Sequence, residues 1–472
     1  MNKESEEGKN PPKENKNLKN KNVSQSKNGF RNEKGKVISM ELAKQIAKEN
    51  YLIKIKEDKR RFHYENGIYK HEGTDHFLKE KIYEKAENIS QYKKNLVIDK
   101  LDVLIGVKKK DFEEKTAPSR LLFLNNGIYD LHNDEFIDFS PDLVAINKVK
   151  TDYNPESGEP KKFISFLREI TGNDLQMIQQ IFEMIGDTLY RGSSLFKKGY
   201  FLYGPPDSGK TVLLRVIKNL IGKSNVSNLG LKDLSQDNYA LAALYEKLAN
   251  IDGDVSDSKI RGTDKFQQIV GGDTLMANPK HEKKFSFENK ATMIFAGNKF
   301  PEVKDPSPGF WRRIHPIYRF KRIPRDERVE REDLIEELTA DEELEGILNV
   351  AIKCLQEARE KKELLNEMEP RQVKNFWYSR SNSVDKFISQ KIANDKSSEV
   401  TNEELWEKYE EFCDDKNLPI ETKRKLGQRI ANDAYLNPSG SNPTTRAGES
   451  VRVWEGIRIV GENEDPRLVT PD

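Results

Sequence analysis

The decisive stretch of this sequence is Gly204-Pro205-Pro206-Asp207-Ser208-Gly209-Lys210-Thr211, which matches the pattern G-x-x-x-x-G-K-[ST]. An apolar run at 200–203 leads into it, and a helix-periodic run at 212–217 follows it. In such a strand–loop–helix unit, backbone N–H groups converge on phosphate oxygens at the helix N-terminus, where the helix dipole favours anions. The stretch therefore predicts a phosphate loop within an α/β core.

Two side chains of this loop have distinct expected roles. Lys210 supplies a positive charge to the β- and γ-phosphates, and the Thr211 hydroxyl is a ligand for Mg²⁺. A chance glycine-rich turn is the alternative, but it does not explain why strand, loop and helix follow in register. We therefore expect residues 204–211 to bind ATP with Mg²⁺, and the chain to hydrolyse it.

Length and composition limit what surrounds the loop. The chain has 472 residues, which exceeds one ordinary core, so about two to four domains are expected. Charged residues make up 34% and the mean hydropathy is −0.82, so we expect no membrane span. No apolar segment follows the start, and Cys354 and Cys413 lack a C-x-x-C spacing. These features predict a cytoplasmic protein with reduced thiols.

Composition and periodicity predict seven segments along the chain. Their expected identities are a disordered polar tail (1–36), an α+β N-terminal domain (37–155), a helical collar (156–198), the ATPase core (199–324), a helical linker (325–380), a DNA-binding domain (381–460) and a tail (461–472).

The expected N-terminal domain contains two Asn-Gly turns, at 65–67 and 125–127, which predict β-hairpins. It shows no compact trio of carboxylates of the kind that holds two metals in a primase or polymerase. The sequence therefore predicts no catalytic site in this segment. The net charge of +1 gives no information on nucleic acids, so DNA contacts must come from local basic patches.

Two apolar runs downstream of the phosphate loop end in polar side chains. The first ends in Asp252 and Asp254, and the second ends in Asn298. Acids at a strand end orient Mg²⁺ and the attacking water, so Thr211, Asp252 and Asp254 are the expected Mg²⁺ ligands. Asn298 can hold the lytic water or contact the γ-phosphate without adding charge. Each pattern alone also fits an ordinary turn, and its position after a phosphate loop favours the catalytic interpretation.

A pair of arginines, Arg312 and Arg313, follows Phe310 and Trp311. An arginine that reaches the γ-phosphate of a neighbouring subunit stabilises the charge that develops in the transition state. Taken alone, the pair is equally compatible with a surface salt bridge.

Together these segments resemble the superfamily 3 helicases, specifically the helicase module of phage and plasmid primase–helicases. The resemblance rests on GPPDSGKT at 204–211, LANIDGDV at 248–255, IFAGNKFP at 294–301 and GFWRRI at 309–314, in that order. It extends to segments that look like the family's pore loop (270–281) and preceding domain (125–130 and 151–155).

This resemblance implies an AAA+-type P-loop NTPase core, a parallel sheet with helices on both faces that assembles as a ring, commonly a hexamer. Asp254 matches the principal acid, which is usually Glu in the family, and Asp252 is its partner. Asn298 matches the sensor residue. Arg313 is the first choice for the finger that acts on a neighbouring subunit, and Arg312 is the second.

The resemblance also assigns Lys280 and His281 to a hairpin that grips DNA phosphates in the channel. The chain departs from the family pattern at Gln267, where the family commonly has Lys. Lys265, two residues away, is a possible substitute. The primase domain that often precedes this module is missing, so we expect a separate primase or polymerase as a partner.

The segment 381–460 shows three helical patterns and a terminal strand pair, which together look like a winged helix. Its third helix is basic. We expect four of its side chains to face DNA phosphates: Lys423, Arg424, Lys425 and Arg429. A solvated helix face is the alternative, and the neighbouring ATPase core favours DNA.

The sequence therefore predicts an ATP-dependent replicative DNA helicase of a mobile genetic element (virus, phage or plasmid). We expect a homo-hexamer that translocates on single-stranded DNA and unwinds forked DNA. The alternative is an ATP-regulated, DNA-binding replication initiator or regulator without helicase turnover. ATP turnover separates these two hypotheses. A protein remodeller is disfavoured because the expected pore loop is basic rather than aromatic.

Overall fold

Phe30 is the first residue that the structure describes, and it lies within the segment 1–36 that we expected to be a polar tail. The Phe30 ring is buried against Leu42 and Ile46, and its carbonyl accepts a hydrogen bond from the Ile38 N–H at 2.7 Å. The first 29 residues of the expected polar tail lie outside the described residues. The computed structural model describes residues 30–461 except 33–34, 193, 237–238, 256–259, 262, 279–283, 305–306, 324–331, 381, 417, 419, 434–435, 437, 439–440 and 447–448.

The chain divides into two compact units. The first consists of Met1–Lys54, Arg61–His63 and Glu72–Val107, and the second of Ile55–Arg60, Tyr64–His71 and Lys108–Asp472. In the first unit, three helices pack around one apolar core, and the Asp102 carboxylate accepts hydrogen bonds from Lys54 and Arg61. Its elements are α1 (Ser39–Glu49), α2 (Thr74–Lys85), α3 (Gln91–Leu104), β4 (Gly106–Val107) and the antiparallel strands β1 (Leu52–Ile55) and β2 (Arg61–Glu65).

Both predicted hairpins are confirmed. Asn66 and Gly67 have positive φ angles of 50° and 89°, as a tight hairpin turn requires. A Cβ atom on Gly127 would lie 2.4 Å from the Phe136 ring, so only glycine fits there. The elements of this part of the second unit are β3 (Ile68–Lys70), α4 (Lys109–Lys115), β5 (Leu121–Phe123), β6 (Ile128–Asp130) and β7 (Glu135–Ile137).

The centre of the second unit is a five-stranded sheet in the order β16-β8-β14-β10-β9, with every neighbouring pair parallel. Because parallel strands share one carboxyl edge, the loops after β8, β14 and β10 emerge at the same edge of the sheet. The strands are β8 (Gly199–Tyr203), β9 (Val226–Ser227), β10 (Ala249–Asp252), β14 (Thr292–Gly297) and β16 (Ile314–Tyr318).

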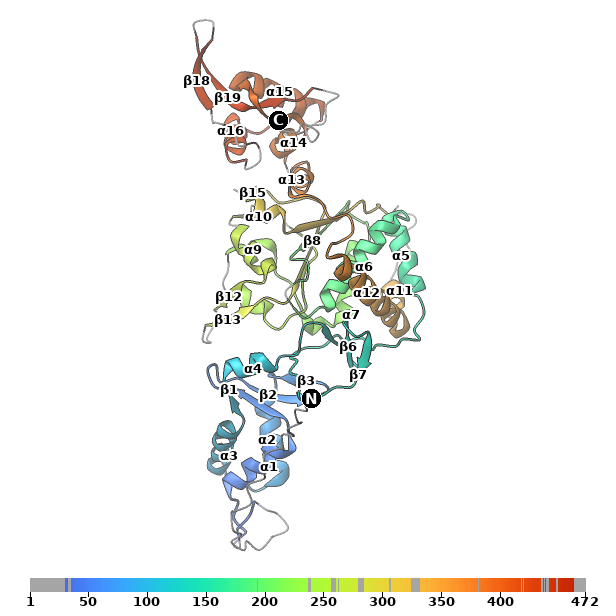
Figure 1. Cartoon of the computed structure of the whole chain (residues 1–472), viewed down its shortest axis with the longest axis vertical. Helices are drawn as coiled ribbons and strands as arrows, with labels where there is room; N and C mark the ends of the chain where they lie inside the picture. The colour runs from blue at the N-terminus through green and yellow to red at the C-terminus, as the bar shows by residue number, and fades with distance from the viewer. Residues whose placement is uncertain are drawn as a thin grey trace, which may run out of the picture. The chain divides into compact units, whose positions relative to one another are not determined.

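Side chains of the sheet alternate between two cores. Ile294 and Ala296 pack in one core, and Met293 and Phe295 pack in the other. Figure 1 shows the helices of the two cores on opposite sides of β8. The expected α/β core with a parallel sheet is therefore confirmed. The helices are α5 (Lys161–Thr171), α6 (Leu175–Leu189), α7 (Lys210–Ile221), α11 (Glu332–Leu338) and α12 (Asp341–Lys361) on one side, and α9 (Thr263–Gly271), α10 (Pro308–Trp311) and α13 (Pro370–Tyr378) on the other.

Short elements connect these layers. Pro370 occupies the first turn of α13, where a proline needs no hydrogen-bond acceptor. The antiparallel hairpin β12–β13 projects from the region between α9 and β14. The connecting elements are η1 (Lys223–Asn225), α8 (Leu231–Gln236), η2 (Ala240–Leu244), β11 (Ile260–Arg261), β12 (Thr274–Ala277), β13 (Phe285–Glu288) and β15 (Val303–Lys304).

The C-terminal part contains the three predicted helices and the predicted final strand pair, and it adds one strand that the sequence did not indicate. This strand, β17, is polar between Asn394 and Glu399, where its pairing with β19 shifts register. The sheet order is β17-β19-β18, all antiparallel. The elements are α14 (Ser383–Lys391), β17 (Ile392–Thr401), α15 (Asn402–Asp415), α16 (Lys423–Ala431), β18 (Ser441–Arg446) and β19 (Glu449–Ile459).

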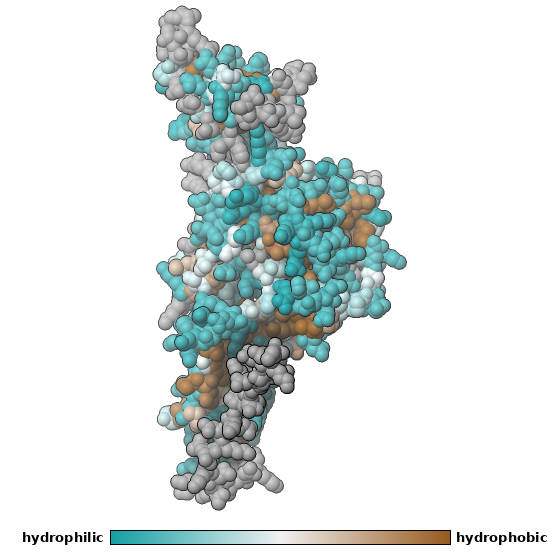
Figure 2. Space-filling model, in the orientation of Figure 1, coloured by the Kyte–Doolittle hydropathy of each residue, from teal (hydrophilic) through white to brown (hydrophobic). Residues whose placement is uncertain are grey.

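The surface is consistent with the charged composition. Figure 2 shows a mostly hydrophilic face with scattered apolar patches. Among the helices of the described residues, none has the length and apolar character needed to cross a lipid bilayer.

Replacing Thr401 with alanine is expected to destabilise the C-terminal part by about 1 kcal/mol. The Thr401 hydroxyl accepts the Glu404 N–H at 3.1 Å, and the Glu404 carboxylate accepts the Thr401 N–H at 2.9 Å, so the two residues form a capping box at the start of α15. Hydrogen exchange of the α15 amides measures the loss. Thr401→Ser keeps the hydroxyl and serves as the control, and equal exchange in all three proteins contradicts the prediction.

Candidate functional site

The phosphate loop is curled around its own lysine. The Lys210 ammonium donates hydrogen bonds to the carbonyls of Gly204 and Pro205 at 2.9 and 2.7 Å, and contacts the Ser208 hydroxyl at 2.9 Å. The Ser208 hydroxyl donates to the Pro205 carbonyl at 2.8 Å. The ammonium therefore occupies the centre of the loop. There it can exchange its carbonyl acceptors for phosphate oxygens.

The backbone of the loop is held by the elements around it. Gly209 has a φ of +74°, and a Cβ atom there would lie 2.5 Å from Ile170 of α5, so the position requires glycine. The Asp207 carbonyl accepts the Ile323 N–H at 2.9 Å, and the Gly204 N–H donates to the Gly297 carbonyl at 3.3 Å. The last bond ties the start of the loop to the end of β14.

We expect ATP affinity to fall as the pH rises through about 8. Burial lowers the pKa of Lys210 to about 8, against a smaller opposing effect of Asp207. Above that pH a growing fraction of the free protein carries a neutral amine, whereas bound polyphosphate favours the ammonium. Binding therefore takes up a proton, and affinity falls by up to about tenfold per pH unit.

Calorimetric titration of ATP at pH 7 and pH 9, in buffers of different ionisation enthalpy, measures this proton uptake. Lys210→Arg keeps its charge across the range and is expected to show no uptake from this position. An affinity that does not change between these two pH values contradicts the prediction.

The two acids lie at the carboxyl end of β10. Asp252 is half-buried and accepts the Asp254 N–H at 3.3 Å, whereas Asp254 is exposed. Burial raises the pKa of the Asp252 carboxyl, and the charges of Asp254 and Asp233 raise it further, whereas the hydrogen bond from the Asp254 N–H and the charge of Lys218 lower it. A cation bound between Asp252 and its neighbouring carboxylates would offset the repulsion between their charges.

The protein side chains at this edge of the sheet can hold Mg²⁺ only together with the phosphate oxygens of a bound ligand. Among the described residues, no three His, Cys, Asp or Glu side chains group as a metal site. Mg²⁺ is commonly held by one or two carboxylates together with phosphate oxygens. Asp252, Asp254 and the exposed Thr211 hydroxyl can supply this smaller protein share.

Asn298 is exposed directly after β14, between the ends of β8 and β10 in the sheet order. The topology thus brings the loop, the acids and the amide, each of which follows a strand, to one edge of the sheet.

Gln267 makes a structural contact, since its amide donates to the Ser307 hydroxyl at 2.9 Å. Lys280 and His281 lie outside the described residues.

The paired arginines differ in exposure. Arg313 is half-buried, and its guanidinium donates to the Gly309 carbonyl at 3.1 Å and lies against Gly271. The Arg312 side chain is exposed, and its carbonyl accepts the buried Lys198 ammonium at 2.7 Å. Of the two arginines, Arg312 is thus the more exposed.

The basic helix α16 divides into an exposed and a buried part. Lys423 and Arg424 are exposed, as a phosphate contact requires. Lys425 pairs with Glu421 at 2.8 Å and approaches Glu302 at 3.6 Å. It is therefore engaged within the protein, although it is not fully buried.

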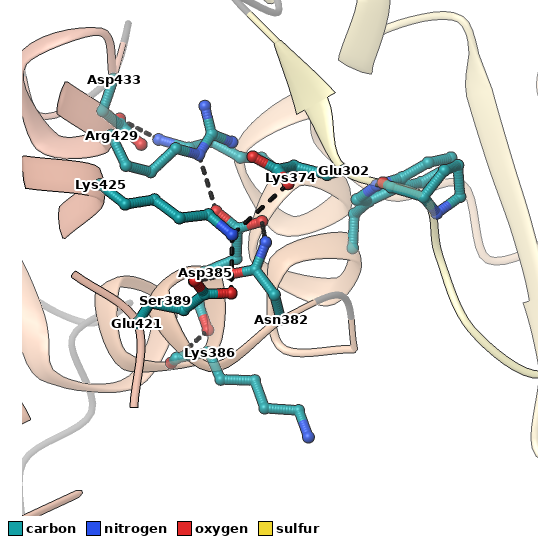
Figure 3. A network of polar contacts seen from close by, with 12 residues as sticks. Glu302, Lys374, Asn382, Asp385, Lys386, Ser389, Glu421, Lys425, Arg429 and Asp433 are labelled. Atoms are coloured by element: carbon teal, nitrogen blue, oxygen red, sulfur yellow. Dashed lines mark hydrogen bonds and ion pairs between the residues drawn. The ribbon is translucent and has the colours of Figure 1, made fainter. Parts of the chain in front are cut away.

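Arg429 is a correction to the expected DNA-binding set. It is 9% exposed, donates to the Asp385 carboxylate at 2.7 Å and stacks on the Tyr378 ring at 4.2 Å. Its charge is used inside the protein, because burying a guanidinium without a partner is costly. Figure 3 shows Arg429 pointing at Asp385, beside the buried ion pair of Lys374 and Asp433.

Three family models match parts of the chain. One described as "Family of unknown function (DUF5906)" matches residues 202–313, which include the phosphate loop and both arginines. One described as "D5 N terminal like" matches residues 15–172, and one described as "Poxvirus D5 protein-like" matches residues 379–446.

Among curated proteins, the "Putative primase C962R" of African swine fever virus is 23% identical over 222 residues, which is 45% of this chain and 21% of that protein. The chain thus spans about a fifth of the length of this relative. Two solved structures of the NrS-1 C-terminal region have TM-scores of 0.49 and 0.48 at 13% and 14% identity, and each match covers 89% of this chain and 99% of the other.

The D5-like matches lie at both ends of the chain, and the viral relative is named as a primase. Each of the family models matches less than half of the chain, so these matches show only what its segments are similar to.

Proposed function

We propose that this chain is the ATP-driven DNA helicase motor of a viral or related mobile element. The observation that carries the proposal is the shared edge of the parallel sheet. There the phosphate loop, the acids Asp252 and Asp254 and the amide of Asn298 follow three adjacent strands. The strand order fits the AAA+-type core that the resemblance implies, and a pure binding switch has no need of such a water-positioning set.

In this proposal the residues at this edge divide the tasks of ATP hydrolysis. Lys210 would exchange its carbonyl acceptors for the β- and γ-phosphates, and Thr211 with the acids would hold Mg²⁺, which would offset charge on the phosphates. Asp254 or Asp252 orients the attacking water, and Asn298 positions it near the γ-phosphate. Because a base-pair step costs about 1.4 kcal/mol on average, ATP hydrolysis is sufficient to drive unwinding.

The C-terminal part is proposed to be a winged helix that binds DNA. Its element order, helix–strand–helix–helix–strand–strand, supports this proposal. The exposed Lys423 and Arg424 at the start of α16 are the proposed phosphate contacts. Contacts of this kind position a protein on DNA without reading its sequence.

Strand displacement on a forked DNA with ATP and Mg²⁺ tests the proposal. The wild type is expected to unwind the fork, and Lys210→Ala is expected to show neither unwinding nor ATP turnover. Lys223→Ala, which removes an exposed lysine beyond the end of α7, is the matched control.

The alternative proposal is a DNA-binding initiator or regulator that uses ATP only for assembly. It predicts ATP-dependent assembly and DNA binding without turnover in the wild type. If the wild type hydrolyses ATP but leaves the fork intact, the ATPase part of the proposal stands and the helicase part fails.

A further inference from the structure

A cavity of about 400 Å³ lies in the second unit, and no residue of the phosphate loop lines it. Its walls come from segments far apart in the sequence, including α4, the base of the β12–β13 hairpin and residues 245–248. Five cationic and three acidic side chains line it, which leaves a net charge of about +2: Arg60, Lys109, Arg191, Lys247 and Lys290, with Glu113, Glu246 and Glu288.

Three of the five cations are engaged by the protein itself. Arg60 donates to Asp58 at 2.7 Å and approaches Glu246 at 3.5 Å. The other two have backbone acceptors, with Lys109 bonded to the Ser286 carbonyl and Lys247 to the Ser224 carbonyl. The unbalanced charge of the cavity is therefore concentrated on Arg191 and Lys290.

Arg191 is 5% exposed and incompletely paired. Its Nε donates to the Asn147 side chain at 3.2 Å, and its guanidinium stacks on the Phe123 ring at 4.6 Å. Its Nη1, however, has no hydrogen-bond partner among the described residues. An arginine is rarely buried without an acid, because its desolvation is not offset by rings and amides alone.

Lys290 adds a second charge to the same cavity. It is half-buried, and burial together with the charge of Arg191 lowers its pKa, with Glu288 and Glu113 opposing. Two cations that repel one another across a cavity create a site for an anion. The most strongly matched anion is a phosphate, whose oxygens accept several hydrogen bonds from guanidinium and ammonium groups.

We propose that this cavity binds a phosphate group, presented either by a free nucleotide or by a nucleic-acid strand, through Arg191 and Lys290. The volume lies within the range of small-ligand sites, and Tyr245 and Phe287 offer aromatic surface to a base or sugar. Because β12 and β13 form one wall, an occupant contacts the base of the hairpin whose loop is the expected DNA grip. The site is independent of ATP hydrolysis.

The test uses the full chain with Lys210→Ala. This substitution weakens phosphate binding by the phosphate loop, so that the loop contributes least to the measured binding. Binding of inorganic phosphate and dTMP is followed by ³¹P line broadening, and binding of labelled oligo(dT) by fluorescence anisotropy. Arg191→Met and Lys290→Met are each expected to weaken binding at least about tenfold, as the loss of a charge-assisted contact implies. Lys110→Met, an exposed lysine of α4 whose side chain is 82% exposed, is the control.

The melting temperature of the free variants separates binding from architecture. If the two cations serve a ligand, neither methionine variant melts below the parent, since each removes an unbalanced buried charge. A response to phosphate and dTMP alone identifies a free anion, and a response to oligo(dT) that both variants weaken identifies a strand. The proposal is overturned if no probe binds, or if Arg191→Met lowers the melting temperature and leaves binding unchanged.

Discussion

Arg312→Ala is expected to lower ATP turnover about 10³-fold or more, the usual effect of losing an arginine that reaches the γ-phosphate from a neighbouring subunit. The exposed Arg312 side chain is free to reach another copy, whereas Arg313 bends back onto Gly309 and Gly271. Lys198 holds the Arg312 backbone in place, since its ammonium is bound by the Arg312 carbonyl and by Glu367 at 2.6 Å. The backbone of Arg312 is thus held in place, and its side chain is exposed.

Complementation between inactive subunits is the sharpest measurement. Lys210→Ala lacks a working phosphate loop but keeps Arg312, and Arg312→Ala lacks the arginine but keeps the loop. Each protein alone is expected to be inactive, and a mixture is expected to recover turnover, because one subunit completes the site of the other. Arg168→Ala, which removes an exposed arginine of α5, is the control.

Two results contradict this prediction. A mixture that stays inactive argues against an arginine acting between subunits. Normal turnover in Arg312→Ala together with a large loss in Arg313→Ala restores the order that the sequence resemblance implied.

Local patterns were sufficient to predict the core of the candidate site. The apolar run before Gly204 and the periodic run after Thr211 each have a single compatible structure, so β8, the loop and α7 followed directly. Asp252 and Asn298 were identified because each follows an apolar run downstream of the phosphate loop, and the parallel sheet places both strand ends at one edge. Strand β17 was not predicted, because its central residues are polar and the sequence there shows no alternation of apolar and polar residues.

The exposure of individual charged residues was harder to predict. Arg429 was assigned to DNA from its charge alone, although it lies three residues after the buried Leu426 and next to the buried Ile430. On a helix those positions share one face, so its burial could have been inferred. No such signal exists for Lys374 and Asp433, which are 59 residues apart and meet only through tertiary packing.

The ion pair between Lys374 and Asp433 is the basis of the second large prediction. Lys374 is 4% exposed and the Asp433 side chain is 0% exposed, so both charges have left water. Removing one partner leaves the other buried without compensation, which typically costs about 3–5 kcal/mol. Lys374→Ala and Asp433→Ala are each expected to lose about this much stability.

The position of the pair determines what is lost. Lys374 lies on α13, whose Trp377 packs in the ATPase core and donates its indole N–H to the Pro301 carbonyl at 2.9 Å. Asp433 follows α16 and also accepts the Leu436 N–H at 3.0 Å. The pair therefore joins the C-terminal helices to the ATPase core, and its loss is expected to raise hydrogen exchange in α14 and α16 more than in α7.

A double-mutant cycle separates the ion pair from simple packing. Lys374→Met combined with Asp433→Leu removes both charges and keeps apolar volume, and is expected to unfold at a urea concentration close to that of the wild type. Single losses that add without coupling would show that the two side chains contribute independently. If instead the double variant is nearly as stable as the wild type, the loss in each single variant comes from the charge that is left buried without its partner.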